Sequence, residues 1–249
     1  MQNNNQKPII SAIIIVGVMI AGAILLRGSS ATSGENSLKN KGIPVETKTL
    51  APIGENDMML GNPKAKVALV LYEDFQCPFC GAVSGSNAYP SLIQSLKQRD
   101  PNWTPFLPGI KENYVKKGEV LFVYRDWAFL GPESIRASEA ARCAGDQGKF
   151  WEYHDYLYEH QKGENKGDFA DANLKSFAKA LKLDTPIFDK CLDDSKYAQA
   201  VADSKNEGLT AGVTGTPKGF ILKDGKISST IDGAESYETV KQKLDNALK

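Results

Sequence analysis

The first feature of the hydrophobic pattern is an uncharged stretch of 19 residues, Pro8–Leu26, whose single polar side chain is a serine. A helix of this length spans about 28 Å, close to the thickness of the hydrocarbon core of a membrane. The apolar stretch of a cleaved signal peptide is usually shorter, about 7–15 residues. We therefore expect residues 1–27 to form an uncleaved membrane anchor, with cleavage near Ser29-Ser30-Ala31 as the alternative.

Residues 28–60 show no apolar periodicity and are rich in Gly, Ser, Asn, Lys and Pro. This composition predicts a mostly flexible linker. The folded domain is accordingly expected at residues 61–249. The short polar tail before Lys7 favours a cytoplasmic N-terminus, which places the folded domain on the other side of the membrane.

Two short apolar runs in the folded domain predict buried strands. One is Lys66–Phe75, which is rich in Val and Leu, and the other is Glu119–Arg125. Between them, Leu and Ile residues at helical spacing predict one helix from Pro78 to about Gln98. Three prolines within residues 100–108 predict a loop before the second strand.

The hydrophobic period becomes helical from Glu133 to about Glu207. Beyond this block, two short apolar runs flank Asp224-Gly225, a sequence that favours a hairpin turn. An amphipathic helix is predicted at Ser236–Leu248. The order of strand, helix, strand, helical block, hairpin and helix predicts an α/β sheet with a helical insertion at about residues 132–210.

The composition narrows the possible functions. The chain has 30 basic and 30 acidic side chains and is 41% hydrophobic, which is typical of a globular protein. Because the net charge is zero, there is no overall electrostatic attraction for nucleic acid, and we expect no nucleic-acid partner. Four cysteines in 249 residues are too few for a small scaffold that is held together by disulfides.

Two of the cysteines form the sequence Cys77-Pro78-Phe79-Cys80, between a predicted strand end and helix start. A zinc half-site, a structural disulfide and a redox-active dithiol are the three open interpretations. A zinc site needs a second pair of ligands, whereas Cys143 and Cys191 are far apart in the sequence. The start of a helix offers unpaired backbone N–H groups and a positive dipole end, which stabilise a thiolate. We therefore favour a redox-active dithiol in which Cys77 attacks and Cys80 resolves, with no metal and no further cofactor.

Three segments carry a family resemblance: GNPKAKVALVLYEDFQCPFC at residues 61–80, AARCAGDQGKFWEYHDYL at 140–157 and GVTGTPKGFIL at 212–222. They resemble, in order, the DsbA-like branch of the thioredoxin superfamily. The resemblance implies an α/β thioredoxin fold in which the helical insertion forms a cap. It also implies an exported enzyme, a protein thiol-disulfide oxidoreductase.

The resemblance implies further roles around the two cysteines. Pro217 is expected to be a cis-proline packed against the Cys77–Cys80 pair, with the backbone of Thr216 facing the sulfurs and ready to pair with an extended client segment. Pro78 and Phe79, between the cysteines, are expected to support this site.

Relatives of this branch often carry an acid six residues before the first cysteine, where it serves proton transfer to the buried thiol. This chain has Leu71 there. Glu73 lies two residues further on, on the same face of the predicted strand. It can substitute for the missing acid, or it is simply a solvated residue at the strand end.

Cys143 and Cys191 lie on two predicted helices of the insertion. Two free buried thiols are one possibility. Related proteins have a second bridge in the cap, so the resemblance implies a structural disulfide between Cys143 and Cys191.

The predicted function is the introduction of disulfides into client proteins by exchange through the Cys77–Cys80 pair. The alternatives are an isomerase or reductase of the same fold and a non-catalytic, chaperone-like client-binding module. The expected partners are unfolded or reduced exported proteins and a quinone-linked membrane reoxidase, with the protein itself a monomer. The expected location is the cell membrane, with a single span, a cytoplasmic N-terminus and a periplasmic or extracellular C-terminal domain.

Overall fold

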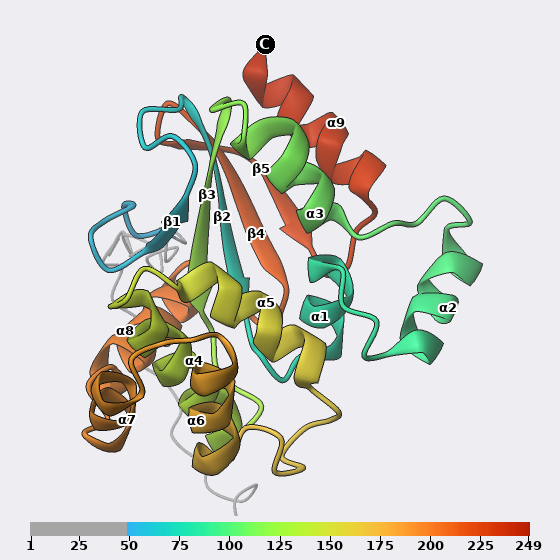
Figure 1. Cartoon of the computed structure of the whole chain (residues 1–249). Coiled ribbons are helices and arrows are strands. Elements are labelled where there is room, and N and C mark those ends of the chain that lie inside the picture. Colours follow the sequence, from blue (N-terminus) through green and yellow to red (C-terminus); the bar gives the residue numbers. More distant parts are fainter. Residues whose placement is uncertain (1–48) are drawn as a thin grey trace, which may run out of the picture. The chain divides into compact units, whose positions relative to one another are not determined.

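The structure is a computed structural model that describes residues 49–249. The predicted anchor at residues 1–27 and most of the predicted linker lie outside the described residues. Within the part described, no helix is both long enough and apolar enough to cross a membrane. A mixed sheet with the strand order β1-β3-β2-β4-β5 stands at the centre, with helices on both sides and a helical cap at one end (Figure 1). The predicted thioredoxin-like α/β fold is confirmed.

The strands are β1 (Met58–Leu60), β2 (Val67–Glu73), β3 (Val120–Asp126), β4 (Lys218–Lys223) and β5 (Lys226–Asp232). β2 runs parallel to β3 and antiparallel to β4, while β1 and β5 pair antiparallel at the two edges. All seven residues of β2 are buried, because the strand is paired on both sides and covered on both faces. Its nearly continuous apolar sequence is typical of such a central strand.

The helices outside the cap are α1 (Pro78–Ser84), α2 (Pro90–Arg99), α3 (Phe106–Ile110), which continues into a π-helical turn at Lys111–Val115, and α9 (Tyr237–Leu248). The cap helices are α4 (Pro132–Gly145), α5 (Phe150–His160), α6 (Asp171–Ala180), α7 (Thr185–Asp193) and α8 (Ala198–Thr210). The cap helices occupy the range that the sequence assigns to the insertion. α5 packs against α1, so the cap reaches the start of the helix that carries the two cysteines (Figure 1).

Three groups of buried side chains join these layers. One sheet face, which includes Leu69 and Leu71, packs against α1, α3 and α9. The opposite face, which includes Val70 and Tyr72, packs against Val213 and the segment before β1. The third group fills the cap and also contains Cys77, Cys80, Phe75 and Tyr124. The cysteine pair therefore lies where the cap core meets the end of the sheet.

The predicted single helix at Pro78–Gln98 is wrong. The structure has two helices here, because Gly85 adopts a left-handed conformation (φ 92°) that ends α1. The backbone N–H of Gly85 donates to the Ala82 carbonyl and that of Ser86 to the Gly81 carbonyl, a pattern that closes a helix C-terminus. Pro90 then starts α2.

The predicted loop at residues 100–108 is wrong in its last part, since α3 begins at Phe106. Three apolar side chains of α3 are buried against the sheet and α9. Pro108 is accommodated because it lies in the first turn, where a backbone N–H has no partner within the helix. The predicted hairpin is confirmed, and Asp224 and Gly225 both have positive φ in its turn.

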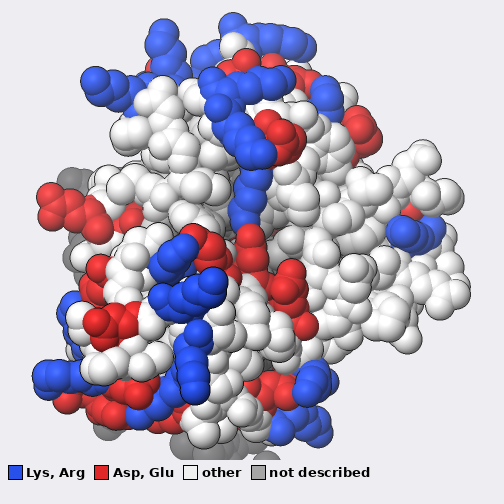
Figure 2. Space-filling view, in the orientation of Figure 1, with Lys and Arg blue, Asp and Glu red and all other residues white. Residues whose placement is uncertain are grey.

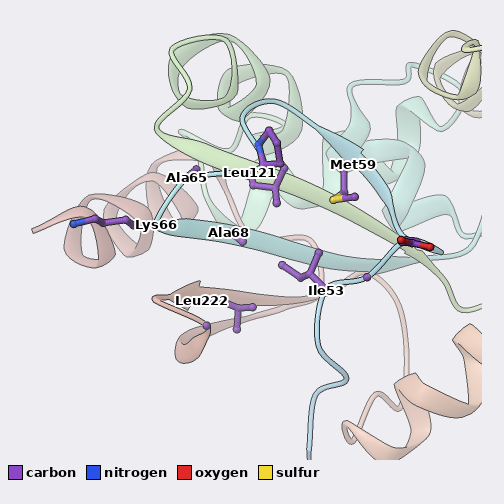
Figure 3. Close-up of a pocket in the computed structure, with 11 residues that line it drawn as sticks. Ile53, Met59, Ala65, Lys66, Ala68, Leu121 and Leu222 are labelled. Atoms are coloured by element: carbon purple, nitrogen blue, oxygen red, sulfur yellow. The ribbon is translucent and has the colours of Figure 1, made fainter.

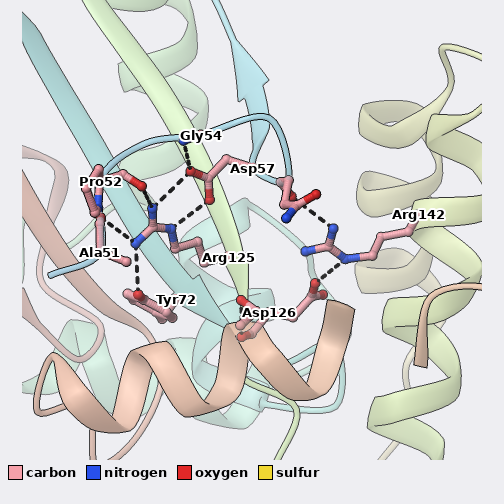
Figure 4. A network of polar contacts seen from close by, with 10 residues as sticks. Ala51, Pro52, Gly54, Asp57, Tyr72, Arg125, Asp126 and Arg142 are labelled. Atoms are coloured by element: carbon pink, nitrogen blue, oxygen red, sulfur yellow. Dashed lines mark hydrogen bonds and ion pairs between the residues drawn. The ribbon is translucent and has the colours of Figure 1, made fainter. Parts of the chain in front are cut away.

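The predicted linker extends too far, because part of residues 28–60 belongs to the folded unit. β1 pairs with β3, and Leu50 and Ile53 pack on the sheet. A buried polar network fastens this segment (Figure 4). The fully buried Arg125 guanidinium donates to both carboxylate oxygens of Asp57, at 2.7 and 2.9 Å, and to the carbonyl groups of Ala51 and Pro52.

A second buried arginine extends the same network to the cap. Arg142 on α4 donates to the Asp126 carboxylate at 2.6 Å and to the Asn56 carbonyl at 3.0 Å. The segment before β1 therefore contacts both the sheet and the cap through charged hydrogen bonds (Figure 4).

Charges of both signs are interspersed on the face shown in Figure 2, whereas the region of α2 carries few of them. This agrees with the zero net charge of the chain.

The buried Arg125–Asp57 pair gives a test of the fold. We expect Asp57→Ala to lower the free energy of unfolding by about 3 kcal/mol, because it leaves a buried guanidinium without its carboxylate. Denaturation by urea, followed by circular dichroism, measures this change. As a control, Lys190→Ala removes an exposed ion pair with Asp194 and is expected to leave the stability close to that of the wild type. Equal stability of the Asp57→Ala variant and the wild type would contradict the role of the network.

Candidate active site

The site begins with a tight turn after β2. The buried Asp74 carboxylate accepts hydrogen bonds from the backbone N–H groups of Gln76, Phe129 and Leu130, at 2.8 to 3.0 Å, and from the Ser134 hydroxyl at 2.6 Å. The backbone N–H of Cys77 donates to the Asp74 carbonyl. This one carboxylate thus joins the loop before Cys77 to the start of the cap and fixes the position of Cys77.

Cys77 occupies the position directly before α1, and Pro78 is the first residue of the helix. Its pKa is lowered from the ordinary value, first because the Cys80 thiol donates a hydrogen bond to its sulfur. Burial acts in the opposite direction, and the backbone N–H groups of Cys80 and Phe79 favour the thiolate again. The geometry therefore favours a thiolate at Cys77.

Cys80 lies one helical turn away and is fully buried. Its pKa is raised well above the ordinary value, first by burial and then by the hydrogen bond to the Cys77 sulfur and the negative charges of Cys77 and Glu73. The two thiols therefore differ: the pKa of Cys77 is lowered, whereas that of Cys80 is raised.

The segment before β4 faces the pair from the other side. The Thr216–Pro217 peptide bond is cis, and the Thr216 carbonyl oxygen lies 3.4 Å from the Cys77 sulfur, which donates to it when protonated. Pro217 is buried, whereas Phe79 is 39% exposed. The structure thus brings together all the residues that the resemblance assigned to this site: Cys77, Pro78, Phe79, Cys80, Thr216 and Pro217.

Glu73 is the last residue of β2 and is fully buried, so the alternative of a solvated residue is wrong. One carboxylate oxygen lies 3.5 Å from Nε2 of His154 on α5. The other oxygen is buried and has no hydrogen-bond partner among residues 49–249. Burial raises the pKa of Glu73, although the hydrogen bond and the charge of His154 oppose this.

Cys143 on α4 and Cys191 on α7 form a disulfide within the cap. This leaves Cys77 and Cys80 as free thiols. Among the described residues, no group of three or more His, Cys, Asp or Glu side chains is arranged to hold a metal ion.

Sequence reasoning missed two contributions to the site. The first is His154, which contacts Glu73. The second is Gln76, whose side chain accepts from the backbone N–H of Asn165 in the cap and donates to Ser134. Both lie in the motifs that carry the resemblance, QGKFWEYHD and DFQCPFC, and this was the available signal.

A cavity of about 390 Å³ lies away from this site (Figure 3). It is lined by apolar side chains such as Ile53, Ala68, Leu121 and Leu222. Ala68 is near the start of β2, whereas Cys77 follows the other end of that strand. The cavity is therefore not part of the cysteine site.

With this geometry in place, comparison with known proteins identifies the family. The thioredoxin family model matches residues 54–92 and 102–246. The chain belongs to the thioredoxin family. The resemblance to its DsbA-like branch, which the motifs indicated, is also confirmed. The family model does not match residues 93–101, most of which belong to α2.

Two curated relatives show how the match extends. The probable disulfide bond formation protein D of Bacillus cereus is 24% identical over 243 residues, which cover 95% of this chain and 97% of that protein. The Na⁺/H⁺ antiporter NhaA 1 of Salinispora arenicola is 30% identical over 169 residues, which cover 67% of this chain. The chain spans only about a fifth of that longer relative, 22% of its length.

The fold is shared with solved structures. The crystal structure of oxidised BdbD from Bacillus subtilis has a TM-score of 0.64 and 21% identity, and the match covers 79% of this chain and 95% of that chain. This likeness supports the arrangement of sheet and cap described above.

The hydrogen bond between the two thiols yields a prediction. In the reduced protein, we expect Cys80→Ala to raise the pKa of Cys77, because the main donor to the thiolate is lost. The pH dependence of the ultraviolet thiolate absorbance measures this change, and the alkylation rate at neutral pH should fall with it. Ser84→Ala, on the same helix, is the matched control and should leave the titration unchanged. An unchanged or lower pKa of Cys77 in Cys80→Ala would refute the assignment.

Proposed function

We propose that the chain is a protein thiol-disulfide oxidoreductase that introduces disulfides into exported client proteins. The observation that carries this proposal is the asymmetry of the two thiols, a buried Cys80 that retains its proton and a Cys77 that favours the thiolate. This difference is what dithiol-disulfide exchange requires of an attacking and a resolving cysteine. The name of the Bacillus cereus relative agrees with such an activity.

The exchange proceeds in two balanced steps. A client thiolate attacks the sulfur of Cys77 in the Cys77–Cys80 disulfide, the S–S bond breaks, and Cys80 leaves as a thiolate that takes up a proton. The second client thiolate then attacks the client sulfur of the mixed disulfide, and Cys77 leaves as a thiolate. The client has lost two electrons to the cysteine pair. Glu73, whose negative charge contributes to the raised pKa of Cys80, is proposed to exchange the proton with it.

Client binding is proposed at the backbone of Thr216. Its carbonyl lies beside the Cys77 sulfur, so an extended client segment that pairs with this backbone brings its own cysteine to the reactive sulfur. Two partly exposed aromatic side chains can offer apolar contacts: Phe79 in α1, next to Cys77, and Phe129 after β3, whose backbone N–H donates to the Asp74 carboxylate. Main-chain pairing suits an enzyme that accepts many different clients.

The lowered pKa of Cys77 agrees with an oxidase. A stabilised thiolate stabilises the reduced form and makes the disulfide more oxidising. An isomerase shares this chemistry, and a chaperone-like module binds clients without it. An isomerase needs Cys77 but adds no new disulfides to a reduced client, whereas a chaperone-like module does not need Cys77 at all.

The proposed location and partners rest on the N-terminal sequence and the chemistry of the cycle. The apolar stretch Pro8–Leu26 supports a single membrane anchor with a cytoplasmic N-terminus and a periplasmic or extracellular catalytic domain. An oxidase must pass the electrons that it takes from its clients to an acceptor. A quinone-linked reoxidase in the membrane is a suitable acceptor for an anchored enzyme. The proposed working form is a monomer whose own cofactor is the Cys77–Cys80 disulfide.

A redox titration tests the direction of the reaction. We expect a potential nearer to about −120 mV, as in a strong oxidase, than to about −270 mV, as in thioredoxin. The fraction of oxidised Cys77–Cys80 in glutathione buffers, measured by thiol alkylation and mass spectrometry, gives this value. A potential near the thioredoxin value would contradict the oxidase and favour the reductase.

Refolding of a reduced, disulfide-containing client provides the parallel assay. Cys77→Ser is expected to abolish disulfide formation. If the protein were a chaperone-like module, the same variant would suppress client aggregation as well as the wild type does. A fully active Cys77→Ser variant would rule out the proposed function.

A further inference from the structure

A line of polar groups leads from the buried end of β2 to the protein surface. Glu73 contacts Nε2 of His154 at 3.5 Å, and Nδ1 of the same ring contacts the Asp155 carboxylate at 2.8 Å. Asp155 also accepts from Lys111 at 3.0 Å. Glu73 and His154 are fully buried, whereas the Asp155 side chain is 53% exposed. His154 thus links a buried carboxylate to one that meets solvent.

The surroundings of His154 are aromatic. Rings from β3, from α5 and from the turn after β2 lie around the imidazole with centroid distances of 4.9 to 6.1 Å, and they belong to Phe75, Tyr124, Phe150, Trp151 and Tyr158. His154 is fully buried among these rings. The imidazole is therefore the polar group that connects Glu73 with Asp155 on this side.

The hydrogen-bonding pattern fits proton transfer. Nδ1 of His154 donates to the Asp155 carboxylate, which leaves Nε2 as an acceptor that faces Glu73. A protonated Glu73 can therefore give its proton to Nε2 while Nδ1 gives its own proton to Asp155. Burial acts to raise the pKa of Asp155, but the hydrogen bonds from His154 and Lys111 outweigh it and lower this pKa to about 2. Asp155 is therefore ionised near neutral pH, which keeps Nδ1 of His154 as the donor, and it holds a relayed proton only in passing to solvent.

The titratable and charged groups near Glu73 come from several elements. They are Cys80 on α1, Tyr124 and Asp126 on β3, Arg142 on α4, which is paired with Asp126, His154, Asp155 and Tyr158 on α5, Asp74 in the turn after β2 and Lys111 in the π-helical turn. Burial raises the pKa values of the two tyrosines, so both remain neutral and cannot serve as bases near neutral pH. Lys111 is held at the outer end of the line by Asp155.

A purely structural role explains Glu73 poorly. A buried carboxyl group is costly unless its polar atoms are paired. One oxygen of Glu73 has no partner in the described part of the chain, and the other has only the long contact to His154. A leucine of similar size would fill the same space without this cost, as Leu71 does two residues earlier on the same strand. The acid is therefore explained by a change of protonation during the reaction.

We propose that Glu73, His154 and Asp155 form a proton path between the buried Cys80 thiol and solvent, and this inference rests on the proposed thiol-disulfide exchange. When the reduced pair is reoxidised, Glu73 first passes its proton through His154 and Asp155 to water. The Glu73 carboxylate then takes the proton of Cys80. The Cys80 thiolate attacks the Cys77 sulfur of a mixed disulfide, the Cys77–Cys80 bond forms, and the partner leaves as a thiolate.

Oxidation of the reduced full-length protein by oxidised glutathione separates formation of the mixed disulfide at Cys77 from ring closure by Cys80, the step in which Cys80 loses its proton. The Cys77 thiolate first attacks the glutathione disulfide and releases one glutathione thiolate, which needs no proton from Cys80. Cys80 then closes the ring, releases the second glutathione thiolate and loses one proton. Acid quenching and mass spectrometry follow the mixed disulfide as it forms and decays.

We expect Glu73→Gln, His154→Gln and Asp155→Asn to leave formation of the mixed disulfide within about twofold of the wild type. Ring closure should slow by about tenfold or more, so the mixed disulfide accumulates. In the variants, ring closure should also rise more steeply with pH than in the wild type, because hydroxide must then deprotonate Cys80. Asp155→Asn is the variant safest for folding, since the side chain is half exposed.

Matched controls lie on the same helix. His160→Gln removes a histidine that contacts the Tyr156 carbonyl, and Glu152→Gln removes an exposed carboxylate that pairs with Lys149. Both should close the ring at the wild-type rate with the wild-type pH profile.

The outcomes distinguish this proposal from the function on which it rests. If the wild type closes the ring and the folded Asp155→Asn and His154→Gln variants close it equally fast with the same pH profile, the proton path is refuted while the exchange activity stands. A wild type that forms neither the mixed disulfide nor the Cys77–Cys80 bond would instead refute the proposed function. Equal slowing of both steps would also refute the path, because it indicates a structural effect.

Discussion

The hydrogen bond from the buried Cys80 thiol to the Cys77 sulfur is the interaction on which the chemistry depends. Burial keeps the proton on Cys80, and this proton in turn favours the thiolate of Cys77. The backbone N–H groups at the start of α1 add to this difference, because they favour the thiolate of Cys77 as well. The fold serves the site by burying Cys80 completely and by holding the Cys77 sulfur next to the Thr216 carbonyl.

Several elements cooperate to maintain this burial. Cys77 follows the end of β2, the central strand of the sheet, and α5 of the cap packs against α1. The segment before β4 places the Thr216 carbonyl next to the Cys77 sulfur. The Asp74 carboxylate joins the active-site turn to the beginning of the cap. Further away, Arg125 and Arg142 fasten the segment before β1 to the sheet and the cap. Buried charges of this kind tolerate few changes, since removal of one partner leaves the other unpaired.

The sequence sufficed to predict the central strands, the helical insertion, the hairpin and the cysteine pair, because each has a strong local signal. It misjudged the region after α1, since a single glycine in a left-handed conformation outweighed a helical pattern that continued beyond it. β1 was missed because a strand of three residues has almost no periodicity, and its place depends on the distant partner strand β3. The contact between Glu73 and His154 was equally inaccessible. It joins residues 81 positions apart in the chain and depends on how α5 lies across the end of β2.

Capture of the mixed disulfide tests the central claim, that Cys77 is the attacking sulfur and Cys80 the protected one, most directly. A Cys80→Ser variant is mixed with a reduced client and an oxidant, and the covalent complex is digested and mapped by mass spectrometry. We predict a client disulfide at Cys77, and a parallel Cys77→Ser variant should form little or no complex through Cys80. A client linked equally well to Cys80 in the Cys77→Ser protein would contradict the account.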